Sequence, residues 1–223
     1  MTQQRLPVVV LISGNGSNLQ TFIDGQMAGE LPIDIKAVVS NRADAYGLTR
    51  ATSAGITAQT LPHGGYPSRD EYDRDLTALI EQHQPELVIL AGFMRILTPA
   101  FVSHFAGRLI NIHPSLLPAF RGLDTHERAL AAGVKEHGCS VHFVTPELDA
   151  GPVIVQAKVP VLSDDTADTL AKRVQTQEHR IYPLAVRWLA EGRVEMRADG
   201  VYRDGKRQSS PPVLSAERNG QEV

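Results

Sequence analysis

The chain has 223 residues, of which 42% are hydrophobic and 21% charged, and its formal net charge at pH 7 is −3. A chain of this length buries roughly 70% of its unfolded surface, and the composition is that of a globular protein rather than a disordered one. The slightly negative charge argues against general nucleic-acid binding, and the single cysteine, Cys139, excludes an internal disulfide and a cysteine-based zinc site.

The first apolar run ends at Ile12 and is too short for the core of a secretory signal. No stretch approaches the roughly 20 apolar residues of a membrane span. We therefore expect a cytoplasmic protein that has no membrane partner.

The N-terminal half shows the alternation of strands and helices that is typical of a parallel sheet. Residues 8–12 form a continuous β-branched run, and a polar turn follows over 13–18. Apolar residues then recur at helical spacing, namely Leu19, Phe22, Ile23 and Met27. Strand, glycine loop and helix in this order open a doubly wound α/β sheet. Further strands are predicted over 33–39, 87–91 and 109–113, with a helix that ends near Gly55 and another that begins at the capping box Ser68–Glu71.

The C-terminal half has a different pattern. Residues 141–144 and 153–156 predict two strands that join the sheet as antiparallel additions. A long amphipathic helix is expected over 166–190, kinked or divided at Pro183. Residues 204–223 are rich in Gly, Ser, Pro and charge, so we predict a loose tail there. The fold class is thus α/β, with one domain over 1–203.

The loop Gly14–Asn18 has the composition of an anion site at a helix N-terminus. It is not a dinucleotide fingerprint, because the third glycine would fall on Leu19 and no acidic residue ends the second strand. A Walker lysine is also missing, so a phosphate monoester suits the loop better than NAD or ATP. The alternative is a glycine turn that only connects two elements.

The segment Asn111-Ile112-His113-Pro114 ends a predicted strand. Alternation places Asn111 and His113 on one face of it, and Pro114 forces an extended conformation on the residue before it. A carboxamide and an imidazole therefore converge at the carboxyl end of a parallel strand, where open α/β sheets bind ligands. A purely structural histidine is the alternative.

Two further loops are candidates for the same site. Asp149 lies in a polar turn between two strands, and a carboxylate near an imidazole favours the protonated ring; turn propensity alone would also explain it. The loop Gly92–Leu97 could line a slot for a flat heterocycle or simply cover the core. The other histidines show no metal-binding spacing, so no metal is expected.

Taken together, these segments resemble the phosphoribosylglycinamide formyltransferase family over roughly residues 8–195. The string Asn111–Pro118 is similar to that of enzymes which use 10-formyltetrahydrofolate. The loop Ser13–Asn18 and the segment Val174–His179 narrow the resemblance to the glycinamide ribonucleotide branch. The loop 119–124 departs from some members in carrying Arg121 and Asp124, in a segment that is a flexible lid in the family.

The resemblance implies a role for each matching residue. The catalytic residues would be Asn111, His113 and Asp149. The substrate phosphate would bind at Gly16, Ser17 and Asn18, and its ribose and glycinamide end at Gln175, Thr176, Gln177 and Glu178. The folate would be held by Arg69, Met94, Arg95, Ile96, Leu97, Asn111, Thr145, Pro146, Glu147, Leu148 and Asp149. The phosphate-binding half would then span about 7–105, and the folate-binding and catalytic half about 106–203.

The implied reaction is formyl transfer from 10-formyltetrahydrofolate to the amine of N1-(5-phospho-D-ribosyl)glycinamide in purine biosynthesis, without a metal. Its partners would be small molecules only, and the chain a monomer or homodimer. Alternatives from the same fold are another formyltetrahydrofolate-dependent transferase or a hydrolase. We expect neither alternative, because about thirty residues after the long helix are too few for the RNA-binding domain of the methionyl-tRNA enzyme, and the first strand begins too early for the hydrolase's regulatory domain. A non-catalytic binder of phosphate ligands is the alternative from another class.

Overall fold

The structure is a computed structural model that describes residues 5–215. It divides into two compact units between Asn111 and Ile112, close to the predicted division near residue 105, and each unit is considered by itself. The strand β5 (Leu109–His113) carries the chain across this division. The prediction of one domain over 1–203 stays a prediction.

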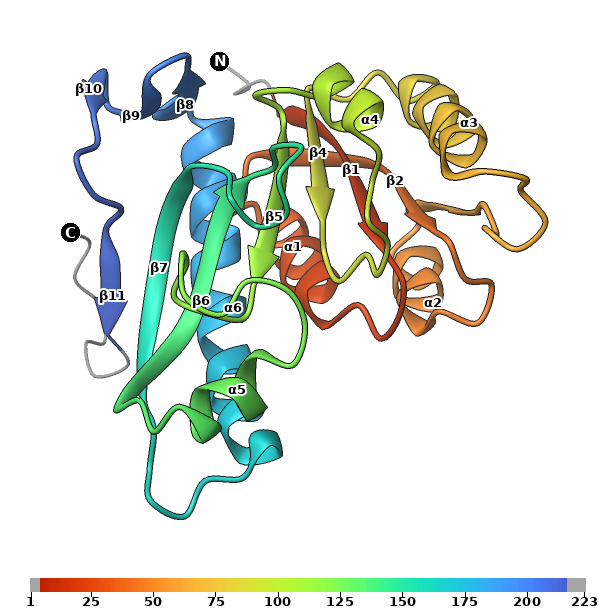
Figure 1. Cartoon of the computed structure of the whole chain (residues 1–223). Helices are drawn as coiled ribbons and strands as arrows, with labels where there is room; N and C mark the ends of the chain where they lie inside the picture. Colours follow the sequence, from red (N-terminus) through yellow and green to blue (C-terminus); the bar gives the residue numbers. More distant parts are fainter. Residues whose placement is uncertain (1–4, 216–223) are drawn as a thin grey trace. The chain divides into compact units, whose positions relative to one another are not determined.

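The first unit alternates strands and helices along the chain (Figure 1). In chain order its elements are β1 (Leu6–Ile12), α1 (Ser17–Met27), β2 (Ile33–Ser40), α2 (Tyr46–Ser53), β3 (Thr57–Thr60), α3 (Arg69–Glu81), β4 (Leu87–Leu90), α4 (Pro99–His104) and β5. The strands pair in parallel in the order β3-β2-β1-β4-β5. Because crossovers between parallel strands are right-handed, the reversal of direction after β3 puts α1 and α2 on one face and α3 on the other.

The centre of this sheet explains the continuous apolar run of the sequence. All five side chains of residues 8–12 are 0% exposed, and Val10 pairs with Val38 on one side and Ile89 on the other. A strand covered by helices on both faces needs apolar residues at every position rather than at alternate ones. The strand order reverses at β1, so the carboxyl ends of β1 and β4 flank the switch point of the sheet, where such folds bind ligands.

The second unit is built on an antiparallel pair and a long helix. Its elements are α5 (Thr125–Ala131), β6 (Glu136–Phe143), β7 (Val153–Pro160), α6 (Ala167–Ala190), β8 (Val194–Arg197), β9 (Gly200–Arg203), β10 (Lys206–Arg207) and β11 (Val213–Ser215). The strands β6 and β7 pair antiparallel, with Val141 opposite Val155, and α6 packs on both. A small antiparallel sheet, in the order β10-β9-β8, follows α6. The mostly parallel sheet with antiparallel additions confirms the predicted fold class.

Two expectations for this unit differ in part from the structure. Of the two alternatives predicted at Pro183, a kink or a division, the division is wrong, because α6 continues to Ala190. A proline inside a helix costs about 3 kcal/mol, and the fully buried side chains Leu170, Ile181 and Val186 of the same helix each contribute about 1.5–3 kcal/mol, so packing outweighs the missing hydrogen bond. The helix begins where the sequence predicts, with Thr166 as its N-cap.

The predicted loose tail is also wrong for the part that the structure describes. Residues 206–207 form β10 against β9, and residues 213–215 form β11, which pairs in parallel with the edge strand β7. The reason is the open edge of β7, whose N–H and C=O groups offer a template for pairing. Residues 216–223 lie outside the described part of the chain.

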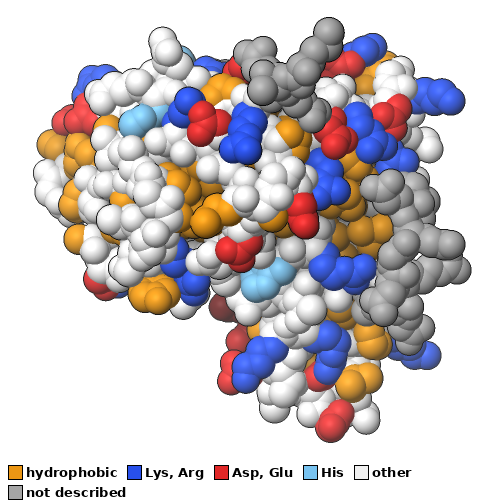
Figure 2. Space-filling view, turned by 180° about the vertical axis from the view of Figure 1, so that it is seen from behind, with side chains coloured by type: hydrophobic (Ala, Val, Ile, Leu, Met, Phe, Trp, Pro, Cys, Tyr) orange, Lys and Arg blue, Asp and Glu red, His pale blue; other side chains and the backbone are white. Residues whose placement is uncertain are grey.

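Charged side chains of both signs are mixed on the face of the molecule drawn in Figure 2. Figure 2 shows Lys and Arg side chains interspersed with Asp and Glu over one face of the molecule, rather than gathered by sign. Across residues 5–215, no helix has the length and apolar character needed to cross a membrane. Cys139 is buried in β6, which raises the pKa of its thiol and leaves it a small packing residue.

Candidate active site

The loop after β1 leads directly into the N-terminus of α1, as predicted. Gly16 is the N-cap residue and has a left-handed φ of 73°. A Cβ atom at this position would lie 2.8 Å from the Cα of Gly47, so only glycine allows this close approach. Gly16, Ser17 and Asn18 therefore lie together where helix N–H groups are unpaired within the helix. The first turn of α1 contains no acidic residue, so the positive end of its dipole has no acidic side chain of its own.

The loop after β4 lies beside this first loop in the same unit. Ser13 joins them: its N–H donates to the carbonyl of Gly92 at 3.1 Å, and its Oγ accepts from the N–H of Met94 at 2.8 Å. The same hydroxyl donates to Oδ1 of Asn41. Sequence reasoning missed Ser13 and Asn41 as loop supports, because only the fold brings residues this far apart in the chain together.

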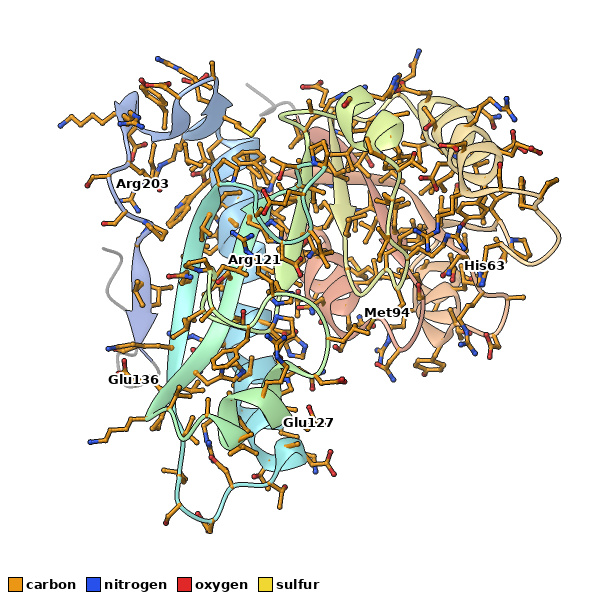
Figure 3. The ribbon with its side chains drawn as sticks, in the orientation of Figure 1. His63, Met94, Arg121, Glu127, Glu136 and Arg203 are labelled. Carbon is orange, nitrogen blue, oxygen red and sulfur yellow. The ribbon has the colours of Figure 1, made fainter. Side chains whose placement is uncertain are left out.

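The far end of this loop is fixed as well. The N–H of Thr98 donates to Oδ2 of the buried Asp73 at 2.6 Å, and the guanidinium of Arg95 stacks 4.2 Å from the centre of the Tyr72 ring. Between these supports, Met94 and Ile96 remain 75% and 58% exposed, and Met94 is labelled in Figure 3. A rigid loop that presents apolar side chains to solvent suits the binding of a flat, mostly apolar group.

Arg69 lies on α3, the helix to which the end of this loop is fixed. It is the first residue of α3, whose N-cap Ser68 accepts from the N–H of Glu71 as the predicted capping box requires. Within residues 5–215, no hydrogen bond or ion pair involves the exposed Arg69 side chain. The folate contact predicted for Arg69 therefore stays a prediction.

The second unit brings His113 and Asp149 together, although 36 residues separate them in the sequence. Nδ1 of His113 lies 3.4 Å from Oδ2 of Asp149, and both side chains are less than 10% exposed. Nε2 of His113 lies 3.0 Å from the carbonyl oxygen of Phe120. Nδ1 of His113 thus faces a carboxylate, and Nε2 faces a backbone carbonyl oxygen. Asn111 precedes His113 by two residues on β5, which places both on one side of that strand.

Asp149 is held in place by its backbone and by a neighbouring loop. Its φ is 49°, in the left-handed region that Asp and Asn adopt more readily than other residues. Its Oδ2 accepts from the N–H of Gly122 at 2.9 Å. The buried His142 lies on its other side, with Nε2 at 3.8 Å from Oδ1. Burial lowers the pKa of His142, so this second imidazole stays neutral near pH 7.

Sequence reasoning did not connect His142, Phe120 or Gly122 with the catalytic residues. His142 carried a signal, since it lies on the strand that leads into the Asp149 loop. The contacts of residues 120 and 122 run through backbone atoms, which no residue pattern reveals. In addition, Arg121, which is labelled in Figure 3, forms an ion pair with Glu147 of the Asp149 loop at 2.9 Å.

The rest of the loop that contains Asp149 is more open. Thr145 donates to the carbonyl of Glu147 at 3.4 Å, and Leu148 is 52% exposed. This loop therefore combines a buried carboxylate at one end with an accessible apolar side chain beside it. The folate contacts predicted for Thr145, Pro146, Glu147 and Leu148 stay predictions.

The predicted substrate residues 175–178 lie in the middle of α6. Helical geometry directs their side chains to different faces of the helix. Gln175 and Glu178 are three residues apart and share a face. Thr176 donates to the carbonyl of Lys172 in its own helix, and the buried Gln177 accepts from Arg180 at 2.7 Å. One ligand can therefore meet Gln175 and Glu178 together more easily than all four. Among the described residues, no cluster of His, Cys, Asp and Glu could hold a metal ion.

Comparison with known proteins agrees with this geometry. The model of the formyl transferase family matches residues 6–186. Phosphoribosylglycinamide formyltransferase of Escherichia coli (strain K12) is 58% identical over 200 residues, which cover 90% of this chain and 94% of that protein. The trifunctional purine biosynthetic protein adenosine-3 of Homo sapiens is 44% identical over 89% of this chain, which spans 20% of that longer protein.

A solved structure extends the agreement to the fold. The structure of the phosphoribosylglycinamide formyltransferase from Coxiella burnetii, in complex with CHES, has a TM-score of 0.89 and 53% sequence identity. The match covers 94% of this chain and 99% of that one. Since the family model matches most of the sequence and a relative at 58% identity is covered almost in full, the chain belongs to the formyl transferase family.

Proposed function

We propose that this chain transfers a formyl group from 10-formyltetrahydrofolate to the amine of N1-(5-phospho-D-ribosyl)glycinamide. The family and the relatives make it a formyltransferase of purine biosynthesis that uses a folate-type donor. The single observation that supports the catalytic assignment is the buried contact of His113 with Asp149. His113 lies two residues beyond Asn111 on β5. Cytoplasmic location and a monomeric or dimeric state stay predictions.

The reaction creates charge that Asn111 and His113 are suited to stabilise. The glycinamide nitrogen attacks the formyl carbon, and the formyl oxygen becomes negative. The amide N–H of Asn111 and an N–H of the His113 imidazolium would donate to that oxygen, and each such donor typically contributes about 3–4 kcal/mol. The tetrahedral intermediate then collapses as the bond to the folate nitrogen breaks, and the proton lost by the amine moves to that nitrogen.

The contacts of His113 indicate which ring nitrogen can donate to the formyl oxygen. Nδ1 faces Asp149, which orients the ring. Nε2 is the remaining donor, and it now meets the carbonyl of Phe120. We infer that the formyl oxygen replaces this carbonyl as the acceptor, so that the loop 119–124 gives way when substrate binds.

The binding roles follow from the two loops and α6. We assign the phosphate to Gly16, Ser17 and Asn18, at the N-terminus of α1. The donor would contact residues 94–97 and 145–149, which present apolar side chains beside polar backbone. On α6, we assign the ribose and glycinamide contacts to Gln175 and Glu178, while Thr176 and Gln177 shape the helix around them.

The test is a coupled assay with 10-formyltetrahydrofolate and glycinamide ribonucleotide that follows formation of tetrahydrofolate. We expect stoichiometric N-formyl product, which mass spectrometry can identify. Tetrahydrofolate and free formate without formylated product would indicate a hydrolase instead. Retention of both ligands without turnover would indicate a non-catalytic binder.

The phosphate assignment predicts the effect of Ser17→Asp. An acidic residue is compatible with the first turn of a helix, so the fold should persist. Its charge would repel the substrate phosphate and raise KM for glycinamide ribonucleotide by about tenfold or more. The donor KM should change by less than about twofold. Ser209→Asp, at an exposed position in the second unit, adds the same charge and should change neither; an equal rise in both KM values for Ser17→Asp would move the phosphate site elsewhere.

The folate assignment of Arg69 predicts a smaller effect. If its exposed guanidinium meets the acidic part of the donor, Arg69→Ala removes an interaction worth about 0.2–1 kcal/mol. The donor KM should then rise about 1.5- to 5-fold, with kcat and the other KM unchanged. Arg74→Ala, on the same helix and also exposed, is the matched control. Equal donor KM values for the two variants would leave Arg69 as a solvated surface charge.

A further inference from the structure

Arg50 of α2 donates hydrogen bonds to the loop Gly14–Asn18, to which we assign the substrate phosphate. Sequence reasoning did not single out this residue. Nε of Arg50 donates to the carbonyl of Asn15 at 2.9 Å, and one Nη donates to the Oδ1 of the same residue at 3.0 Å. The other Nη donates to Oε1 of Gln20, in the first turns of α1, at 2.9 Å. The planar guanidinium therefore fixes the loop and the helix that follows it through three bonds.

A second contact from α2 acts on the preceding peptide. The N–H of Gly47 donates to the carbonyl of Gly14 at 3.0 Å, so the carbonyls of Gly14 and Asn15 both point toward α2. In a trans peptide, the carbonyl and the following N–H point in opposite directions. Holding these two carbonyls therefore turns the N–H groups of Asn15 and Gly16 away from α2. With Gly16 in the left-handed conformation, successive N–H groups of this kind form an anion-binding concavity.

The charge of Arg50 is not balanced locally. Within the part of the chain that the structure describes, no carboxylate lies within ion-pair distance of its guanidinium, whereas Arg42 pairs with Asp44 at 2.8 Å. Within residues 5–215, the hydrogen bonds of the Arg50 guanidinium go to neutral oxygens. The guanidinium also lies 4.8 Å from the centre of the Tyr46 ring, over its face. A half-buried, unneutralised cation beside a loop of N–H groups increases the positive potential there.

We propose that Arg50 is a positioning residue of the phosphate-binding loop, which holds the N–H groups of residues 15 and 16 in place and supplies the loop with a positive charge. This inference rests on the proposed function, because it needs the loop to bind the substrate phosphate. It predicts that Arg50 sets the affinity for the phosphorylated substrate without touching the donor or the reacting atoms.

The test compares Arg50→Met and Arg50→Lys with the native chain. The measured quantities are kcat, both KM values, and the inhibition constant of inorganic phosphate in competition with glycinamide ribonucleotide. For Arg50→Met, we expect KM for the ribonucleotide and the phosphate inhibition constant to rise together by about tenfold, while kcat and the donor KM change less than about twofold. Arg50→Lys keeps the charge but loses the planar set of donors. Its ribonucleotide KM and phosphate inhibition constant should therefore lie between those of the native chain and those of Arg50→Met. Arg42→Met removes one exposed charge from the same region and should leave all four values unchanged.

Three results would overturn the inference. One is a fall in kcat or a rise in the donor KM as large as the rise in the ribonucleotide KM, which would indicate general structural damage. Another is the same phosphate inhibition constant in Arg50→Met as in the native chain. The third is an equal effect of Arg42→Met. Ser17→Asp separates the two levels of the proposal: if it weakens ribonucleotide binding while Arg50→Met does not, only the role of Arg50 is wrong, and if it has no effect, the phosphate site itself is wrong.

Discussion

Replacing Asp149 with asparagine is expected to lower kcat by about 10²-fold or more, with much smaller changes in substrate affinity. The variant keeps the size of the side chain, and asparagine tolerates the left-handed backbone at this position. Its Oδ1 can still accept from the N–H of Gly122. What disappears is the negative charge 3.4 Å from Nδ1 of His113, which would stabilise positive charge on the imidazole while the ring donates to the oxyanion.

Two measurements separate this electrostatic role from a structural one. Steady-state kinetics should show the loss in kcat, and the His113 ring resonances in an NMR spectrum should change, because the ring loses its charged neighbour. Asp168→Asn, at an exposed position in the first turn of α6, removes the same charge and should leave kcat within about twofold. Unchanged kcat and unchanged His113 resonances in Asp149→Asn would return Asp149 to the status of a turn residue.

Removing either oxyanion donor should be at least as damaging. Asn111→Ala and His113→Ala each take away one donor, and the loss of one such donor typically costs about 10²- to 10³-fold in kcat. Because both act on the same oxygen, the double variant should lose less than the product of the two single losses. Both residues lie on β5. The two single variants and the double variant therefore test two neighbouring positions at the end of one strand rather than two distant sites.

His113→Ala also leaves the buried carboxylate of Asp149 without its partner, which can destabilise the fold. His113→Asn keeps a hydrogen-bond donor at this position without the imidazolium charge and serves as a second variant. Thermal unfolding of each variant shows whether it remains folded. Strictly multiplicative losses in folded variants would mean that Asn111 and His113 act on different steps or different atoms.

Local pattern was sufficient for much of the fold. The buried run over 8–12 reads as a central strand because both faces are covered. The N-caps Ser68 and Thr166 mark helix starts through hydrogen bonds that span only three residues. The position of Asn111 and His113 on one strand follows from the period of two. These features depend on neighbours in sequence, so the sequence by itself determined them, together with the family to which the chain belongs.

Only the tertiary structure decided the features that depend on residues far apart in the chain. The strand β11 exists because β7 has an open edge, and nothing in residues 213–215 alone announces a strand. Arg50 donates to the carbonyl of Asn15, which is 35 residues away in the sequence. Asp149 accepts from the N–H of Gly122, which is 27 residues away. Such contacts involve backbone carbonyls and N–H groups, which every residue carries. Their partners are therefore selected by how the strands and helices pack, and no residue pattern records that selection.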